Sequence, residues 1–318
     1  MPGLDIVIVN WNTGGQLRAC LDSIAAAGRR GFDLLRVVVV DNASTDGSAD
    51  GLERAGLPLA LLRNDRNRGF AAACNAGASG SAADYVLFLN PDTRLFADSL
   101  SHAVSFMELP ENRGAGLAGI RLVDGTGNEA PSCSRFPTLG SLLSKSLGLH
   151  RLSRRLFPTY ALSPGGTGEG GEIDYVTGAF FLVRREVFEA LGGFDERFFV
   201  YFEETDFARR MRSRGWTCRH LGGASAYHRG GGASEQAGAE RLFYAAASRI
   251  LYARKQFGPA AAGVYVAAAL TLEPVFRIAG SLVPRTGASP RDTARAYGML
   301  YRALPRVLRG SSVDGRSS

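Results

Sequence analysis

Short apolar runs separated by helix-like segments are the feature of this sequence that most limits its fold. The runs occupy residues 6–9, 37–40, 59–62 and 85–89 and consist mainly of valine, isoleucine and leucine. Helical spacing of apolar residues is found at 16–27 and 69–78, and another helical segment is expected between residues 47 and 59. Strands that are apolar on both faces and alternate with helices are typical of a parallel sheet covered on both sides. The sequence therefore predicts an α/β fold with a mostly parallel central sheet flanked by helices.

Polar side chains directly follow each of these predicted strands. In chain order they are Asn10 and Asn12, Asp41 and Asn42, Arg63 and Asn64, and Asn90 and Asp92. In doubly wound sheets, ligands bind beyond the carboxyl ends of the strands. The polar residues therefore predict a binding site at this edge of the sheet.

The rest of the chain is predicted to complete this domain and then to add a helical extension. Residues 135–171 are rich in serine, glycine and proline and are expected to form a loop with at most one short helix. Strand pattern resumes at 173–183, and helices are expected at 185–191, from about residue 203, and at 235–256. We expect a main domain over residues 1–232 and a helical, basic extension over residues 233–318.

Charge and hydropathy give the extension two interpretations. The net charge of +7 and the late arginines indicate an anionic partner, such as nucleic acid, an anionic membrane face or a phosphorylated substrate, or a solvated basic surface. The apolar run 260–272 is interrupted by Glu273, Pro274 and Arg277 and is shorter than the roughly 20 residues of a transmembrane helix. A core helix or a helix lying in the membrane plane is therefore expected.

The cysteines and the first residues of the chain indicate its cellular compartment. The 4 cysteines are scattered without metal-binding spacing and are expected to be buried free thiols. The first residues lead directly into a strand pattern, without a basic leader or an apolar segment followed by a cleavage site. A cytoplasmic location is expected.

Three acidic groups are candidates for chemistry. Asp41 can accept hydrogen bonds from a nucleobase edge or a ribose hydroxyl, and Trp11 can stack on a base or pack under its loop. Asp46 is a candidate for capping the next helix. Asp92 can form a turn with Asn90 and Pro91, or it can bind a Mg²⁺ or Mn²⁺ ion that bridges a diphosphate. With Asp41 at another strand end, we favour the metal.

The third group is Glu203-Glu204-Thr205-Asp206, which follows several aromatic residues. Acidic residues are common in the first turn of a helix, but a carboxylate in aromatic surroundings can also be a general base. Further along, His228 stands before glycines and can be a metal ligand or an ordinary surface or core histidine.

In this order, the motifs resemble the family 2 glycosyltransferases, and within them the rhamnosyltransferase-like bacterial branch. The resemblance covers roughly residues 4–255. Its motifs are IVIVNWN at 6–12, VDNASTDGS at 40–48, NRGFAAACNAG at 67–77, LNPD at 89–92, GA at 178–179, GFDE at 193–196 and FVYFEETD at 199–206. Each motif is weak alone, but together they make a strong match.

The resemblance implies the GT-A fold of nucleotide-diphospho-sugar transferases and inversion of the sugar by single displacement. It divides the main domain into a donor half, about residues 1–130, and an acceptor half, about residues 131–232. It assigns the donor nucleotide sugar to eight residues, namely Val9, Trp11, Asp41, Asn67, Gly69, Asn75, Asn90 and Asp92. It assigns the acceptor to Gly178 and Asp206.

The resemblance also implies the catalytic and metal-binding residues. Asp92 matches the last acid of the family's Asp-x-Asp motif, whose first acid is replaced by Asn90, so His228 is expected to be the second protein ligand of Mg²⁺ or Mn²⁺. The family's base is usually the second acid of a Glu-Asp pair and maps to Glu204; Glu203 stays an alternative.

The expected partners follow from this resemblance. They are a nucleotide-sugar donor, with dTDP-rhamnose as first choice before UDP-hexoses or UDP-galactofuranose, and a glycan or polyprenyl-linked saccharide acceptor. A peripheral contact with the inner face of the cell membrane and a homodimer are both compatible with the sequence, and nucleic acid is not expected. The alternatives are a sugar-1-phosphate nucleotidyltransferase, which would need a basic glycine-rich loop after the first strand, and a non-catalytic glycan-binding module.

Overall fold

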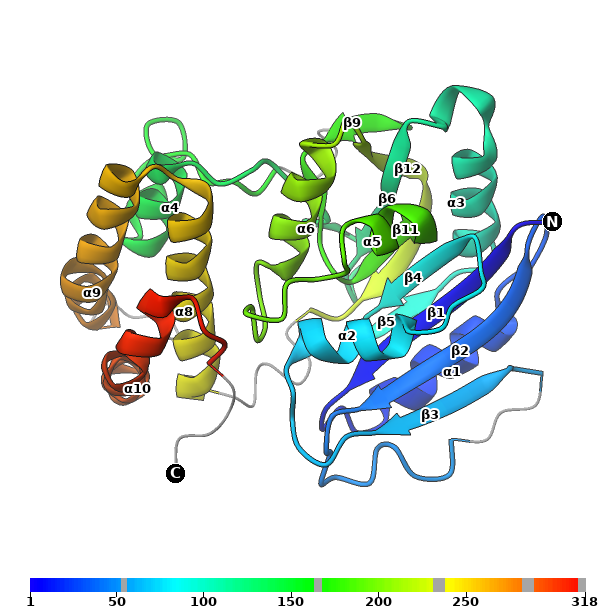
Figure 1. Cartoon of the computed structure of the whole chain (residues 1–318), viewed down its shortest axis with the longest axis horizontal. Helices are drawn as coiled ribbons and strands as arrows, with labels where there is room; N and C mark the ends of the chain where they lie inside the picture. Colours follow the sequence, from blue (N-terminus) through cyan, green and yellow to red (C-terminus); the bar gives the residue numbers. More distant parts are fainter. Residues whose placement is uncertain (53–55, 163–167, 231–237, 282–288, 314–318) are drawn as a thin grey trace. The chain divides into compact units, whose positions relative to one another are not determined.

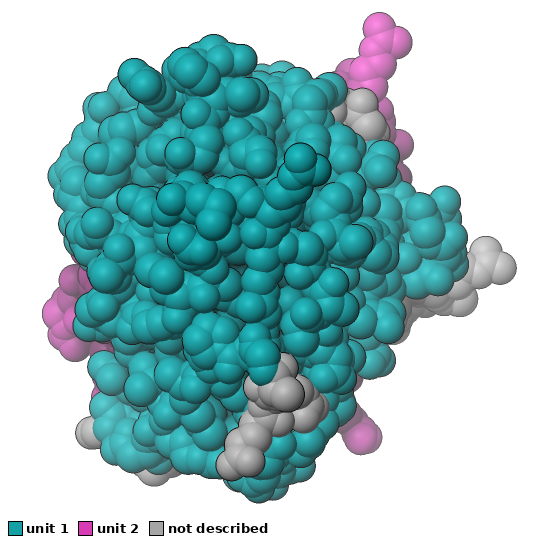
Figure 2. All heavy atoms as spheres, turned by 90° about the vertical axis from the view of Figure 1, so that its right-hand side faces the viewer, with its two compact units in different colours: residues 1–135, 161–195, 204–233 teal, residues 136–160, 196–203, 234–318 magenta. Residues whose placement is uncertain are grey.

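The computed structural model describes residues 1–52, 56–162, 168–230, 238–281 and 289–313 (Figure 1). They fall into two compact units, which Figure 2 colours separately. Unit 1 comprises residues 1–135, 161–195 and 204–233, and unit 2 comprises residues 136–160, 196–203 and 234–318. Two segments that precede residue 232 thus group with the C-terminal helices, and the expected domain boundary stays a prediction.

Unit 1 is built on a 10-stranded sheet. Its main path runs through β3 (Leu59–Arg63), β2 (Asp33–Asp41), β1 (Gly3–Asn10), β4 (Tyr85–Leu89), β11 (Phe180–Arg184), β6 (Ala115–Val123), β12 (Thr217–His228) and β5 (Thr93–Leu95). β7 (Glu129–Ala130) pairs with β6, β9 (Gly171–Ile173) pairs with β12, and β8 (Cys133–Ser134) with β10 (Tyr175–Val176) forms a separate two-stranded sheet. The neighbours β3, β2, β1 and β4 are all parallel, as are β6 and β12, whereas β11 is antiparallel to both of its neighbours.

Helices cover both faces of this sheet. They are α1 (Gln16–Ala26), α2 (Phe70–Ala78), α3 (Ser99–Glu108), the short 3₁₀ helix η1 (Pro110–Asn112), α5 (Arg185–Ala190) and α6 (Glu203–Arg212). Ile6 and Ile8 of β1 share a core with α1, while the intervening Val7 points to the opposite face. There a Cβ at Gly77 of α2 would lie 2.4 Å from Val7 Cγ1, so glycine permits the close approach of α2. The two helices therefore cover opposite faces (Figure 1).

A cluster of phenylalanine rings holds α6 in unit 1. Its members are Phe88 of β4, Phe181 of β11, Phe188 of α5, Phe194, and Phe207 of α6. The ring centroids of Phe207 lie 5.3–5.6 Å from those of Phe181, Phe188 and Phe194. Close aromatic pairs add to the free energy of burial, so this cluster anchors the helix that begins with the two candidate bases.

The structure corrects two local expectations in unit 1. Residues 48–52 and 56–58 form no helix, so the helical segment expected there is absent from the described residues, and Asp46 caps no helix. The run 59–62 does form a strand, but β3 pairs only with β2 and its residues 60–63 are exposed. An edge strand has a single strand neighbour, so an apolar run does not guarantee burial. The four cysteines are buried free thiols, as expected.

Unit 2 is a bundle of helices. It contains α4 (Leu139–Ser146), the short 3₁₀ helix η2 (Leu149–Arg151), α8 (Gly238–Gln256), α9 (Pro259–Ser281) and α10 (Pro290–Arg309). α4 is the one short α-helix expected in the segment 135–171, and the expected helical extension is confirmed. The core gathers Ile250 and Tyr252 of α8, Tyr265 of α9 and Leu300 of α10, all fully buried.

The helix α9 is longer than the sequence pattern suggested. It continues through Pro274 for 23 residues, and its segment Pro259–Gly280 is long and apolar enough to cross a membrane, with a mean hydropathy of 1.4. By length and composition, the expectation that this segment is too short to span a membrane is therefore wrong. Interruption by Glu273 and Pro274 did not end the helix, because tertiary contacts of α9 with α8 and α10 outweigh the local preference.

Candidate active site

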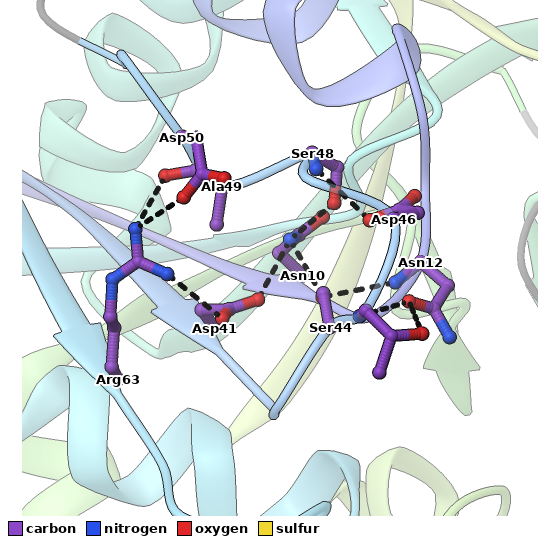
Figure 3. Close-up of polar contacts among 10 residues, drawn as sticks. Asn10, Asn12, Asp41, Ser44, Asp46, Ser48, Ala49, Asp50 and Arg63 are labelled. Carbon is purple, nitrogen blue, oxygen red and sulfur yellow. Dashed lines mark hydrogen bonds and ion pairs between the residues drawn. The ribbon is translucent and has the colours of Figure 1, made fainter.

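The side chain of Asn10 joins the loops that follow β1 and β2. Asn10 is the last residue of β1 and is fully buried. Its Nδ2 lies 3.0 Å from Asp41 Oδ1, 3.0 Å from Ser44 Oγ and 2.9 Å from Ser48 Oγ (Figure 3), and its Oδ1 accepts a hydrogen bond from Thr13 Oγ1 at 2.5 Å. Because β1 and β2 are parallel and paired up to Asn10 and Asp41, both loops leave the sheet at the same edge.

Further hydrogen bonds between these two loops define their backbone. Asn12 Oδ1 accepts from the Thr45 amide at 2.8 Å, and Asp46 accepts from the amides of Gly14 (2.8 Å) and Ser48 (3.0 Å). Although partial burial opposes it, the hydrogen bonds from Ser48 and Gly14 lower the pKa of the Asp46 carboxyl. Asp46 thus links two loops instead of capping a helix.

Asp41 lies at the end of β2 with only 3% of its surface exposed. Besides the contact with Asn10, its Oδ2 lies 3.7 Å from Arg63 Nη1, and Arg63 also pairs with Asp50 at 2.8 Å (Figure 3). The Asp41 carboxylate is therefore oriented by a neutral amide on one side and a half-exposed guanidinium on the other.

Asn42 organises the loop before α2. Its Nδ2 donates to Asn67 Oδ1 and to the Gly69 carbonyl, both at 3.0 Å, and its Oδ1 accepts from Asn64 Nδ2 at 2.8 Å and from the Arg68 amide at 3.1 Å. Gly69 has a φ of 85°, which favours glycine, and it immediately precedes α2. One buried amide thus sets the position of the first turn of α2 relative to the end of β2.

This geometry predicts that Asn42→Ala lowers the free energy of unfolding by about 2–4 kcal/mol, since it removes four hydrogen bonds and leaves buried backbone groups without partners. Chemical denaturation measures the change. The control is Asn128→Ala, which removes a hydrogen bond in an exposed turn and should cost less than about 1 kcal/mol. Equal losses in the two variants would contradict a structural role for Asn42.

Asp92 and His228 meet at the same edge of the sheet. After β4, the turn Asn90–Asp92 leads into β5, which pairs antiparallel with the last residues of β12. His228 Nε2 lies 3.3 Å from Asp92 Oδ1, and the Arg229 amide donates to the Asp92 carbonyl at 3.2 Å. The Ala179 carbonyl accepts hydrogen bonds from the Asn90 amide (3.3 Å) and from Thr93 Oγ1 (3.2 Å). These bonds tie the turn to the residue that precedes β11.

This pair suits a divalent cation that a substrate helps to bind. A carboxylate oxygen and an imidazole nitrogen are common ligands of such ions, and at 3.3 Å apart the two atoms can share one ion. No group of three or more histidine, cysteine, aspartate or glutamate side chains suited to a metal occurs among the described residues. With only two protein ligands, a bound cation would have positions left for water and for oxygens of a substrate. Behind the turn, burial and then the Asp92 charge raise the pKa of the Cys20 thiol.

The two candidate bases differ in exposure. Glu203 begins α6 and is 4% exposed, whereas Glu204 is partly exposed. Tyr201 and Phe202, which come directly before them, both have a φ of 69°. Two consecutive bulky residues in the left-handed region cost free energy and are held by their surroundings, a condition common at functional sites. The boundary between the two compact units falls between Glu203 and Glu204.

Residues 5–192, more than half of the chain, match the family model described as glycosyl transferase family 2. The chain belongs to this family. It is a glycosyltransferase, as the motifs predicted.

Named relatives and solved structures agree with this assignment. The chain is 29% identical, over 243 residues, to an N-acetylglucosaminyl-diphospho-decaprenol L-rhamnosyltransferase of Mycobacterium tuberculosis, covering 70% of this chain and 74% of that one. It is 28% identical to the rhamnosyltransferase WbbL of Escherichia coli over 138 residues, 42% of this chain and 47% of the relative. A mannosyltransferase from Pyrobaculum calidifontis, solved with GDP-Man and Mn²⁺, superposes with a TM-score of 0.53 at 18% identity over 95% of this chain and 81% of that one. The GT-A fold expected from the motifs is confirmed.

Two of the predicted site residues, Asn75 and Asp206, form hydrogen bonds or ion pairs within the protein itself. Asn75 donates to the Phe194 carbonyl and accepts from the Phe194 amide, both at 2.9 Å, so its amide clamps α2 to the segment after α5. Asp206 is fully buried and pairs with Arg210 at 2.8 Å; Arg210 in turn donates to the carbonyls of Leu191 and Gly193. These contacts give both residues a positioning role, and contact with donor or acceptor stays a prediction for them.

The remaining predicted residues lie at the carboxyl edge or near it. Val9 is 8% exposed, Trp11 is partly exposed, and Gly178 lies one residue before the carbonyl that holds the Asp92 turn. Asn10 and Asn42 were predicted only as part of the polar edge of the sheet, and their place at the centres of the two hydrogen-bond networks was not foreseen. Their position directly after a buried strand was the available signal, because a buried amide at a strand end needs partners from neighbouring loops.

Proposed function

We propose that this family 2 enzyme transfers a sugar, with rhamnose from dTDP-rhamnose as first choice, to a hydroxyl of a cell-surface glycan or lipid-linked saccharide. The observation that carries the proposal is the Asp92–His228 pair at the sheet edge that also holds Asp41 and Asn42. The names of the relatives, two rhamnosyltransferases of which one acts on a decaprenol-linked sugar, support the choice of donor and acceptor.

In the proposed reaction, the acceptor oxygen attacks the anomeric carbon from the face opposite the diphosphate. The new carbon–oxygen bond forms as the bond to the diphosphate oxygen breaks, and that oxygen leaves with the electron pair. Glu204 takes the proton of the acceptor hydroxyl, and the anomeric configuration inverts. Partial exposure of Glu204, against near-complete burial of Glu203, supports Glu204 as the base.

Asp92 and His228 would hold Mg²⁺ or Mn²⁺, and the bound ion would supply positive charge to offset the charge that develops on the departing diphosphate. The nucleoside is proposed to lie at the ends of β1 and β2, near Val9, Trp11 and Asp41, where polar loops are tied together by Asn10. The sugar-diphosphate would lie toward Asn67, Gly69 and Asn90. We place the enzyme in the cytoplasm, at the inner face of the membrane that would carry a polyprenyl-linked acceptor.

Family membership decides against the two alternatives considered from the sequence, a sugar-1-phosphate nucleotidyltransferase and a non-catalytic glycan-binding module. Among possible donors, we propose dTDP-rhamnose first, and UDP-hexoses or UDP-galactofuranose second.

Hydrolysis of a panel of nucleotide sugars in the presence of Mn²⁺ tests the donor. We expect dTDP-rhamnose to be consumed fastest and to show the lowest KM. With a lipid-linked saccharide as acceptor, the product should carry the anomeric configuration opposite to that of the donor, as measured by NMR. Preference for another sugar would overturn the choice of donor, and retention of configuration would overturn the single displacement.

A further inference from the structure

One side of α9 is apolar and uncovered. Tyr265, Ala269 and Glu273, spaced four residues apart, are buried within unit 2, whereas five large apolar residues around the rest of the helix are between 40% and 62% exposed. These are Val264, Leu272, Val275, Phe276 and Ile278. Of the apolar segment Pro259–Gly280, only 22% is buried, so most of this helix faces outward although part of it packs into the core of unit 2. An exposed apolar strip of this length indicates a binding surface.

The next helix, α10, carries a stripe of positive charge. Its five exposed arginines are Arg291, Arg295, Arg302, Arg306 and Arg309. Their spacings of 4, 7, 4 and 3 residues place them along one side of a helix. The opposite side, with Ala296, Leu300 and Val307, is buried. The only acid of α10 is Asp292, and none of the five arginines forms an ion pair with a carboxylate in the part of the chain that the structure describes.

The apolar strip and the arginine stripe belong to helices that touch. The hydroxyl of Tyr301 in α10 donates to the Leu270 carbonyl of α9 at 2.5 Å. Tyr301 lies directly before Arg302, and Leu270 lies two residues before Leu272. Unit 2 therefore presents an apolar strip and a basic stripe on neighbouring helices.

A buried ion pair decides between crossing a membrane and lying on it. Glu273 in α9 has no exposed surface and pairs with Arg249 of α8 at 2.6 Å and with Arg277 at 2.8 Å. If α9 crossed a bilayer, either Glu273 would lose Arg249, or α8 would enter the bilayer with its other charged residues. Both are costly. An in-plane orientation keeps this network and still buries the apolar strip.

We propose that α9 and α10 form a membrane-docking surface, with the apolar strip of α9 in the headgroup–acyl boundary and the arginine stripe of α10 on anionic lipid headgroups. α10 carries five exposed arginines and a single acid, so it should be attracted to an anionic lipid surface. A second copy of this chain, which has a net charge of +7, should instead repel it. The inference deepens the proposed function by bringing the enzyme to a lipid-linked acceptor. Binding to lipid vesicles needs neither donor nor acceptor. An experiment can therefore contradict the docking surface without contradicting the proposed function, or the reverse.

The test is co-sedimentation of the full chain with vesicles of phosphatidylcholine alone or mixed with phosphatidylglycerol. We expect binding to the anionic vesicles, weakened by salt, and little binding to phosphatidylcholine alone. The triple variant Arg295→Glu, Arg302→Glu and Arg306→Glu should bind at least about 100-fold more weakly, since each basic residue near an anionic surface strengthens binding about fivefold and the new carboxylates are repelled. The double variant Val275→Gln and Phe276→Gln should weaken binding at least tenfold at constant charge.

The matched control reverses three exposed arginines of unit 1, Arg30, Arg113 and Arg121, to glutamate, with the same change in net charge. It should bind anionic vesicles almost as well as the original chain, and circular dichroism should be unchanged in all variants. An equal loss in this control, or no binding to anionic vesicles at low salt, would overturn the docking surface. So would a dimer in light scattering that the Val275 and Phe276 variant dissociates without affecting vesicle binding. Normal vesicle binding without sugar transfer would overturn only the proposed function.

Discussion

Replacing Glu204 by glutamine is expected to lower kcat by about 10²–10⁴, the usual effect of removing a general base. Glutamine keeps the size and hydrogen-bonding reach of glutamate but cannot take up the proton of the acceptor hydroxyl. The Kd of the nucleotide-sugar donor, measured by calorimetry, should stay nearly unchanged, because the base acts on the acceptor. Single-turnover measurements would separate the chemical step from product release.

The matched control is Glu203→Gln, one residue earlier in the same helix. Glu203 is 4% exposed, so this variant should affect stability more than the chemical step. If Glu203→Gln is inactive while Glu204→Gln keeps its activity, the base is Glu203, and the assignment from exposure is wrong.

Removing the divalent cation is expected to abolish sugar transfer, and Mn²⁺ or Mg²⁺ should restore it. Asp92→Asn should weaken Mn²⁺ binding in the presence of the nucleoside diphosphate by at least about 100-fold, because the only carboxylate of the pair is lost. His228→Ala should raise the Mn²⁺ concentration that gives half-maximal activity by about 10–100-fold. Calorimetric titration of Mn²⁺ gives a measure of the site that does not depend on turnover.

His102→Ala is the control for this experiment. His102 of α3 forms another histidine–carboxylate pair in unit 1, with Glu169 at 2.8 Å. Its loss should leave Mn²⁺ binding unchanged. Full activity in excess chelator would show that Asp92 and His228 hold no catalytic metal.

Local patterns in the sequence were sufficient for the donor half of the sheet. The runs at 6–9, 37–40 and 85–89 became β1, β2 and β4, each buried from end to end at these residues, and the polar residues that follow lie at their carboxyl ends. Strand formation and turn formation both depend mainly on residues that are close in the sequence. Both can therefore be predicted from the sequence pattern. The motif order also predicted the family correctly.

Contacts between distant residues decided what local pattern could not. The pairing of β5 with β12 brings His228 to 3.3 Å from Asp92; the family resemblance suggested these two residues as partners, but the local pattern of neither segment specifies the contact. Likewise, the edge position of β3 left an apolar run exposed, and packing in unit 2 carried α9 through Pro274.

The sequence by itself determined the family, the strands of the donor half, and which residue types could serve as base and metal ligands. Tertiary structure alone decided that Asn75 and Asp206 are used as internal clamps, that Glu203 is buried while Glu204 is partly exposed, and that one side of α9 is uncovered. The physical reason is that burial and partner choice depend on the free energy of the whole packed chain, whereas propensity and turn chemistry act over a few residues.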